Sequence, residues 1–130
     1  MDITRLAGTD WGRGRLFFDD ASAAEEDDFI ETNAPNDEGI FSGRFRDGDD
    51  IDVLLDDEVT GRVISNGLNP LIEFVRRNAD GTVTTRYVGR VIELAGTTTV
   101  MIRGRFTRAT TSSEGAVTIS SGDHEIEKPT

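Results

Sequence analysis

The residue types that carry out most enzyme chemistry are scarce in this chain. It contains no cysteine, which excludes disulfides, thiolate metal sites and cysteine nucleophiles. The single histidine, His124, stands between Asp123 and Glu125. A catalytic histidine needs an orienting partner and a nucleophile or substrate within reach, and no nucleophile motif surrounds His124. We therefore interpret it as a surface residue and assign no catalytic residue.

Carboxylates are the most abundant reactive groups, but their pattern does not define a site. The run Asp47-Gly48-Asp49-Asp50-Ile51-Asp52 invites a calcium interpretation, because hard cations bind clustered carboxylate oxygens. It departs from the EF-hand pattern at Ile51 and Asp52, so a solvated turn is the simpler interpretation. Paired carboxylates can perform acid–base catalysis, yet most pairs fall in expected loops. A P-loop and a dinucleotide fingerprint are also absent, so we expect neither metal nor other cofactor.

The overall charge is strongly negative. Among 130 residues, 25 acidic and 14 basic side chains give a net charge of −11, which disfavours nucleic acids and anionic membranes as partners. A few arginines could form a basic stripe for nucleic acid, but we expect them to pair with carboxylates within the sheet. They are Arg76, Arg77, Arg103, Arg105 and Arg108.

The charges are also unevenly distributed. Sixteen of the 25 acids lie within residues 19–58, and 13 of the 14 basic side chains are arginine, Lys128 being the exception. Abundant carboxylate with little lysine is typical of proteins that work in molar salt, where charges are screened within about 3 Å. In such brine, monovalent cations would associate loosely with the surface. A GC-rich genome is the alternative explanation for the arginines.

A tripeptide of glycine, arginine and an apolar residue recurs five times. It occurs at Gly14-Arg15-Leu16, Gly43-Arg44-Phe45, Gly61-Arg62-Val63, Gly89-Arg90-Val91 and Gly104-Arg105-Phe106. Side chains alternate between the two faces of a strand, so the glycines share a face with apolar residues and the arginines project from the other. We predict that the glycines let the sheet curve strongly. Arg44, Arg62, Arg90 and Arg105 then lie outside as candidate interaction residues. The alternative, an internal anion site, has a high desolvation cost.

The chain is predicted to consist mainly of short strands. Runs of β-branched and aromatic residues between glycine, asparagine and aspartate predict them at Arg13–Asp19, Gly39–Arg46, Ile51–Leu55, Val59–Ser65, Pro70–Arg77, Thr82–Leu94, Thr97–Arg108 and Ala116–Ser120. Turns are predicted at Asn78-Ala79-Asp80-Gly81, Leu94-Ala95-Gly96 and Asp56-Asp57-Glu58. The predicted fold is all-β: residues 1–130 form a single antiparallel barrel, or a strongly coiled sandwich, of about eight strands.

The acidic segment at residues 19–38 is the exception to this strand pattern. Ser22-Ala23-Ala24-Glu25 matches a capping box ahead of Phe29 and Ile30. This pattern predicts one or two helical turns, and a mobile acidic loop is the alternative.

Aromatic residues beside the glycines are the candidate ligand-binding residues. If the barrel is hollow, the missing side chains leave room next to Phe41, Phe45, Tyr87 and Phe106. Trp11 stands just ahead of the first strand. It would either plug one end of the barrel or anchor an interface, where tryptophan is enriched.

Three functions are compatible with these features. The first is a non-enzymatic structural or interaction module that assembles with itself or with protein partners in high salt, for example as a virion or tail component. The second is a small-molecule-binding barrel. The meander of glycine-kinked strands is similar to calycin-type barrels, although no diagnostic motif of that group is present. The third is a metal-independent isomerase or cyclase, which requires a cavity containing Asp, Glu or Arg with a strongly perturbed pKa.

The location expected from the sequence is the cytoplasm, or a virion assembled from a cytoplasmic pool. The first six residues, Met1-Asp2-Ile3-Thr4-Arg5-Leu6, do not resemble a secretory leader. No apolar stretch approaches the 18 residues or so that a membrane-spanning helix needs.

Overall fold

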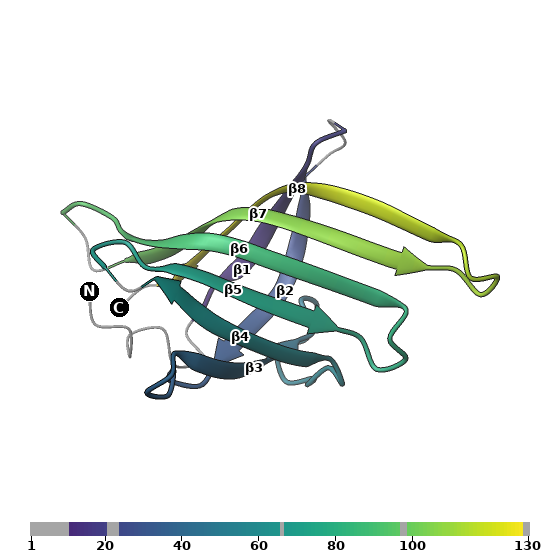
Figure 1. Cartoon of the computed structure of the whole chain (residues 1–130), viewed down its shortest axis with the longest axis horizontal. Helices are drawn as coiled ribbons and strands as arrows, with labels where there is room; N and C mark the ends of the chain where they lie inside the picture. Colours follow the sequence, from purple (N-terminus) through teal and green to yellow (C-terminus); the bar gives the residue numbers. More distant parts are fainter. Residues whose placement is uncertain (1–10, 21–23, 66, 97–98, 129–130) are drawn as a thin grey trace.

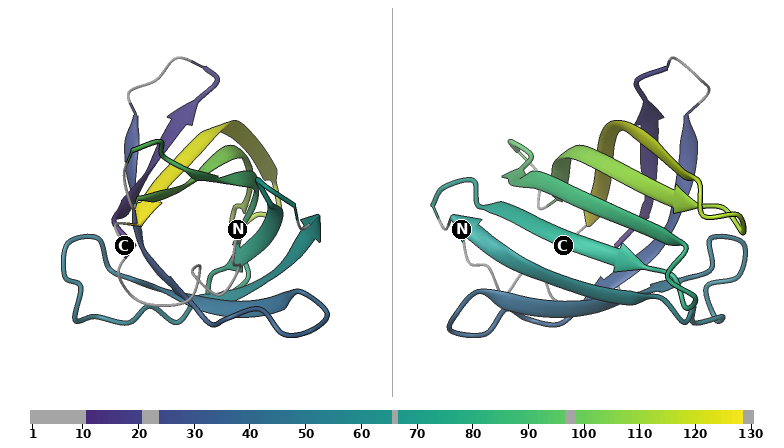
Figure 2. Two further views of the ribbon diagram at one scale, coloured as in Figure 1. Left: turned by 90° about the vertical axis from the view of Figure 1, so that its left-hand side faces the viewer. Right: turned by 45° about the vertical axis from the view of Figure 1, so that its right-hand side comes forward.

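Eight antiparallel strands follow one another around a closed ring in the computed structural model, which describes residues 11–20, 24–65, 67–96 and 99–128. Each strand pairs with the next, and β1 also pairs with β8 (Figures 1 and 2). The strands are β1 (Arg13–Phe18), β2 (Glu25–Thr32), β3 (Ile40–Arg46), β4 (Glu58–Ser65), β5 (Leu71–Arg77), β6 (Val83–Glu93), β7 (Val100–Thr111) and β8 (Val117–Lys128). The predicted all-β antiparallel barrel is confirmed. No helix in the described ranges could cross a bilayer.

The prediction for the acidic segment is wrong, because residues 25–32 form neither a helical turn nor a loop but strand β2. This strand lies between β1 and β3, with Phe29 opposite both Arg13 and Arg46. Arginines of the two neighbouring strands pair with acids of β2: Arg13 with Glu26, and Arg44 with Glu31. Pairing with neighbouring strands therefore overrides a weak local preference. Ser22 and Ala23 lie outside the described residues.

A second correction concerns Ile51–Leu55, which is not a strand. Its only ladder contact is an isolated bridge between Leu54 and Arg46. Ile51, Val53 and Leu54 are 43–50 % exposed, so the alternating apolar pattern has no sheet to pack against. Accordingly, Asp56-Asp57-Glu58 does not connect two strands but leads from a long loop into β4. The strand predicted to end at Ser120 instead continues to Lys128.

Two other predicted turns agree with the structure. The Gly81 amide donates to the Asn78 carbonyl, and the Asp80 carboxylate accepts from the Thr82 amide, which closes the β5–β6 hairpin. Gly81 has a φ of 73°, a left-handed conformation that glycine adopts without a Cβ clash. Gly96, in the turn after β6, has a similar φ of 74°.

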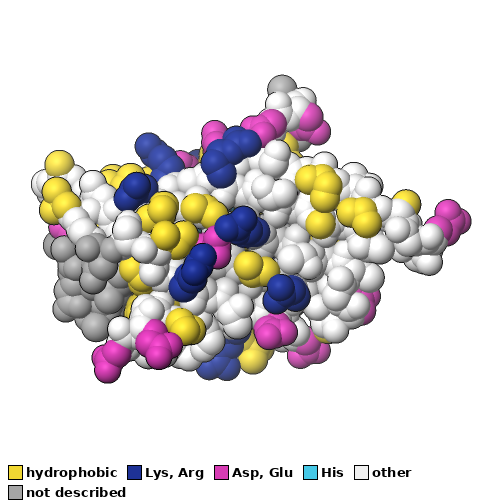
Figure 3. All heavy atoms as spheres, in the orientation of Figure 1, with side chains coloured by type: hydrophobic (Ala, Val, Ile, Leu, Met, Phe, Trp, Pro, Cys, Tyr) yellow, Lys and Arg dark blue, Asp and Glu magenta, His cyan; other side chains and the backbone are white. Residues whose placement is uncertain are grey.

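Apolar side chains fill the interior of the ring. The buried core draws on every strand and includes Leu16, Ile30, Phe41, Phe45, Val59, Ile72, Phe74, Tyr87, Val91, Val100, Ile102, Phe106 and Ile126. These residues come mostly from alternate positions, as expected for a sheet with one buried face. The outward positions carry most of the arginines; Figure 3 shows them spread over one outer face.

The strand glycines explain both the curvature and the filled interior. Gly89 and Gly104 lie opposite each other on β6 and β7. A Cβ on Gly104 would lie 1.9 Å from the Val88 carbonyl oxygen, so only glycine permits this close approach of the two strands. On Gly61, a Cβ would lie 2.4 Å from the ring of Phe41. The aromatic ring therefore occupies the space that the missing side chain leaves.

Candidate functional site

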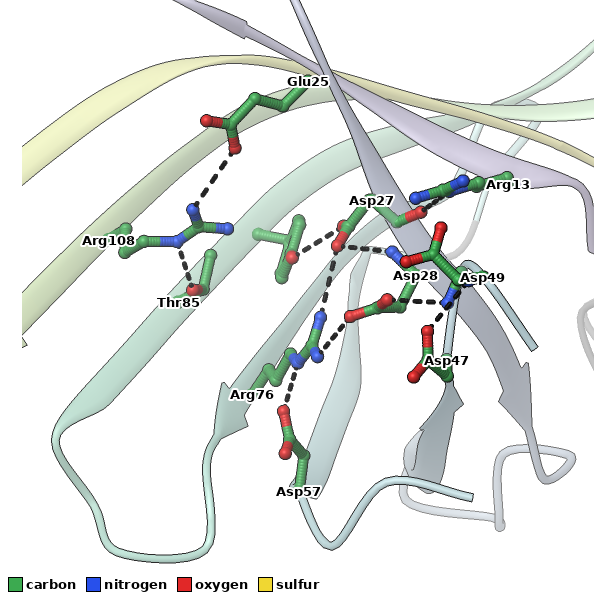
Figure 4. A network of polar contacts seen from close by, with 12 residues as sticks. Arg13, Glu25, Asp27, Asp28, Asp47, Asp49, Asp57, Arg76, Thr85 and Arg108 are labelled. Atoms are coloured by element: carbon green, nitrogen blue, oxygen red, sulfur yellow. Dashed lines mark hydrogen bonds and ion pairs between the residues drawn. The ribbon is translucent and has the colours of Figure 1, made fainter. Parts of the chain in front are cut away.

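One end of the barrel carries a cluster of charged side chains that we call the charged mouth. Because neighbouring strands are antiparallel, the start of β2 and the ends of β5 and β7 meet at this end. The charged mouth consists of Glu25, Glu26, Asp27, Asp28, Asp57, Arg76 and Arg108. They surround an open pocket of about 360 Å³, which Leu16, Asn78, Val83 and Thr85 also line. Figure 4 shows how most of these side chains lie.

Arg76 is the centre of the charged mouth. Its guanidinium group donates to Asp57 at 2.5 Å, Asp28 at 2.7 Å and Asp27 at 3.2 Å (Figure 4). Its Cζ atom also lies 3.8 Å from the centre of the Phe45 ring, a cation–π contact. Burial by itself lowers the pKa of Arg76, but the bonds to Asp28 and Asp57 and the charge of Asp27 outweigh it and raise that pKa. Arg76 is therefore a permanent, fully engaged cation.

Asp27 connects the charged mouth to the barrel interior. Its side chain is only 5 % exposed, and it accepts a hydrogen bond of 2.9 Å from the Tyr87 hydroxyl. Burial, and then the nearby negative charge of Asp27, raise the pKa of Tyr87, so its hydroxyl stays protonated and donates. The Arg13 side chain donates to the Asp27 carbonyl at 2.7 Å, which holds the backbone of β2 in place.

His124 lies in the interior, which corrects its interpretation as a surface residue. It is 4 % exposed because β8 continues past it and places Gly122, His124 and Ile126 on the inner face. Its ring contacts that of Tyr87, with centroids 4.6 Å apart. Burial lowers the pKa of His124 to about 4, although the Asp27 charge opposes this effect. At neutral pH the imidazole is therefore uncharged, and its Nε2 atom lies 3.7 Å from Asp27, beyond hydrogen-bond distance.

The rim of the charged mouth is held more loosely than its centre. Arg108 donates to the Thr85 hydroxyl at 3.2 Å and lies 3.9 Å from Glu25. The side chains of Glu25 and Glu26 are 60 % and 63 % exposed. The pocket lining contains five carboxylates and two guanidinium groups, so it carries a net charge of −3. The excess negative charge lies at the centre, where three carboxylates surround Arg76. At the rim, Glu25 and Glu26 pair with Arg108 and Arg13 but remain more than half exposed.

The run at residues 47–52 is a set of turns in which carboxylates accept backbone amides. Asp47 accepts from the Asp49 amide and Asp50 from the Asp52 amide. The Gly48 amide donates to Asp28, so this loop is attached to the charged mouth. Within the described residues, no three or more His, Asp or Glu side chains are grouped as metal ligands.

The four aromatic residues predicted to line a ligand cavity if the barrel is hollow all lie in the packed core. Phe41, Phe45, Tyr87 and Phe106 are at most 6 % exposed. The apolar cavity that includes Phe41 has a volume of only about 10 Å³, too small for any organic ligand. The charged mouth has room for a ligand, and Phe45 and Tyr87 contact its residues Arg76 and Asp27 from within the core.

Trp11 lies at the opposite end of the barrel, where it helps to fill that end. It is 3 % exposed, and it lines the 10 Å³ cavity together with Ile30, Phe41 and Phe74. The Lys128 ammonium group lies 5.6 Å from the centre of its ring. In this arrangement Trp11 is positioned as a plug and offers almost no surface to a partner.

The four strand arginines proposed for interactions lie on the outer face, as predicted from the alternation. Arg44, Arg62 and Arg105 have side chains 54–61 % exposed. Their partners are Glu31 for Arg44, Glu73 for Arg62, Asp19 and Asp123 for Arg105, and the Asn69 carbonyl for Arg90. These contacts fit sheet pairing, and none of these arginines lines the charged mouth.

Sequence reasoning missed Asp27, Arg76 and His124 as interior polar residues. Arg76 had a usable signal, because it follows Ile72 and Phe74 at the same two-residue spacing and so shares their inward face. His124 had a similar signal, because it lies two residues before the apolar Ile126 and so shares its face once the last strand is extended past Ser120. For Asp27 the sequence offers none, because four consecutive acids hide which of them turns inward.

Comparison with known proteins supports the architecture. A solved structure named AVR2 aligns with a TM-score of 0.65 and 14 % sequence identity, covering 100 % of this chain and 99 % of that chain. At this identity the likeness concerns the fold alone. No protein-family model and no curated protein match the sequence.

Proposed function

We propose that this protein is a small-molecule-binding barrel that takes a small organic cation into the charged mouth. The observation that carries this proposal is the position of the free space. The interior is packed, whereas the pocket of about 360 Å³ opens at the end lined by five carboxylates. That volume is near the lower limit for small-molecule pockets. The excess negative charge selects a cation, because a low-dielectric wall strengthens its field.

The lining also suggests the shape of the ligand. Val83 offers apolar contact to a hydrocarbon body, while the buried Leu16 and Thr85 form the floor of the pocket. Glu25 pairs only loosely with Arg108, at 3.9 Å, and Glu26 pairs with Arg13 at 2.8 Å; both side chains are more than half exposed and can also contact a charged amine. Arg76 does not repel it strongly, because Asp27, Asp28 and Asp57 already neutralise the guanidinium group. A compact amine with an aromatic or aliphatic body therefore fits best.

Isothermal titration calorimetry at low salt tests this proposal with benzylamine, its neutral analogue benzyl alcohol and the anion benzoate. We expect benzylamine to bind about ten-fold more tightly than benzyl alcohol, since one charge-assisted contact is worth about 1.4 kcal/mol. Benzoate should not bind measurably. The Glu25→Gln variant should weaken benzylamine binding several-fold, while Glu127→Gln, on an exposed outward position of β8, should not. Equal affinity for the amine and the alcohol would refute the proposal.

The isomerase or cyclase hypothesis stays a prediction. Arg76 is a residue of the charged mouth with a raised pKa, as that hypothesis requires. A guanidinium group with a raised pKa stabilises negative charge but does not transfer protons, and the nearby His124 does not line the pocket. Assembly with itself, the other function suggested by the sequence, is favoured by a different feature, the free edge of β8.

A further inference from the structure

The hairpin of β7 and β8 extends beyond its neighbours at one end of the barrel. On the β7 side, β6 begins at Val83, opposite Thr110. On the β8 side, the pairing with β1 ends at Phe18 and Gly122, with one further bond from the Asp19 amide to the Ser121 carbonyl. Val117–Ser120 of β8 therefore has β7 on one side and, among the described residues, no strand on the other. Figure 1 shows this hairpin extending to the right.

The backbone of this free edge points its hydrogen-bonding groups away from β7. Neighbouring residues in a strand direct their N–H and C=O groups to opposite sides. The Ser121 carbonyl bonds to Asp19 on the β1 side, so the N–H and C=O groups of Ile119 and Val117 point to that side too. Thr118 instead faces Thr110 of β7. The edge thus offers two donors and two acceptors.

The side chains of the edge are apolar and uncharged. Val117 is 60 % and Ile119 62 % exposed, and the two lie on the same face. Residues 109–122 contain one charged residue, Glu114, in a chain whose net charge is −11. Natural edge strands usually carry charges or prolines that block pairing, and this edge has neither. Figure 3 shows few charged side chains on the visible side of the hairpin.

We propose that Val117–Ser120 pairs antiparallel with the same edge of a second copy of this chain. A register centred on Thr118 places Val117 opposite Ile119 of the second copy, and Ile119 opposite Val117 of that copy. This register satisfies all four outward backbone groups on each strand and stacks the exposed apolar side chains on one face. The contact is two-fold symmetric, so it closes as a dimer.

Charge explains why the second copy, rather than an unrelated strand, is the occupant we infer. Each copy carries a net charge of −11, so two copies repel one another as a whole. The edge itself is uncharged, so contact there adds no repulsion of its own. Since the edge is short, the dimer is weak. Salt screens the remaining repulsion between the two copies, so the affinity of the dimer rises with the KCl concentration.

Sedimentation equilibrium from 10 µM to 1 mM protein, in about 0.1 M and about 1 M KCl, tests this proposal. We expect a monomer–dimer equilibrium that tightens several-fold in the higher salt. Ile119→Lys should abolish it, whereas Leu68→Lys, a matched change at an 84 % exposed position elsewhere, should not. Amide exchange at Val117 and Ile119 should slow as the wild-type concentration rises. A wild-type monomer under all conditions, or a dimer that Ile119→Lys leaves intact, would overturn the proposal.

Discussion

The buried histidine makes the stability of this barrel sensitive to acid. His124 has a pKa of about 4 in the folded protein because burial disfavours its charged form, against 6.5 when it is exposed. Between these values the unfolded chain binds a proton that the folded one does not, so the free energy of unfolding falls as pH drops from 6.5 to 4. At about 1.4 kcal/mol per pH unit, the loss reaches about 3 kcal/mol. At and above neutral pH, His124 contributes no such pH dependence.

The assay is urea denaturation of the wild type and of His124→Asn at half-unit steps from pH 8 to pH 4. Asparagine is smaller than histidine and leaves a small cavity, so the variant is less stable than the wild type at every pH. The comparison therefore concerns only how the free energy of unfolding of each protein changes with pH. The wild type should lose about 3 kcal/mol more than the variant between pH 6.5 and pH 4. Groups remote from His124 titrate alike in both proteins and cancel in the difference. A difference that does not change with pH would show that His124 is not buried as a neutral group.

Three further predictions concern the packing and the charges. Gly104→Ala should lower the free energy of unfolding by about 3 kcal/mol, because the added Cβ would overlap the Val88 carbonyl. Gly67→Ala, which has open space around it, is the control and should change this free energy little. Thermal or urea melts measure both. Arg76→Gln should lower the free energy of unfolding by about 3–5 kcal/mol at neutral pH, because it leaves the carboxylates of Asp27 and Asp57 without their arginine counter-ion. Arg103→Gln, at a 62 % exposed side chain, is the matched control and should change it little. If the acidity is an adaptation to brine, the melting temperature should rise with KCl up to molar concentrations; a flat or falling curve would contradict that interpretation.

The overall fold could be predicted from the sequence because its signals are local and repeated. The alternation around Gly43, Gly61, Gly89 and Gly104 defines an apolar inner face and an arginine-bearing outer face, which the structure has. Strand β2 could not be found in this way. Its first four residues are all acids, which do not favour a strand by themselves. In the folded chain this strand pairs with β1 and β3, whose arginines contact acids of β2.

The candidate site was harder to predict than the fold because it depends on contacts between residues distant in sequence. Arg76 meets Asp27 and Asp28 across 48 or 49 positions, and Tyr87 meets Asp27 across 60. Sequence reasoning placed the ligand space beside the strand glycines, assuming that a missing side chain leaves a gap. In the structure, aromatic rings such as that of Phe41 over Gly61 and close backbone contacts fill those gaps. The pocket at the charged mouth instead lies at one end of the barrel, away from those glycines.

The most direct test of the proposed function is an NMR titration of the ¹⁵N-labelled protein with benzylamine at low salt. We predict that the amide signals of Glu25–Asp28, Asp57 and Arg108 shift progressively with benzylamine and not with benzyl alcohol. Signals around Trp11 and Ile102, at the packed opposite end, should stay unchanged. Shifts confined to that opposite end, or no shifts at the charged mouth at millimolar benzylamine, would contradict the assignment of this pocket as a cation site.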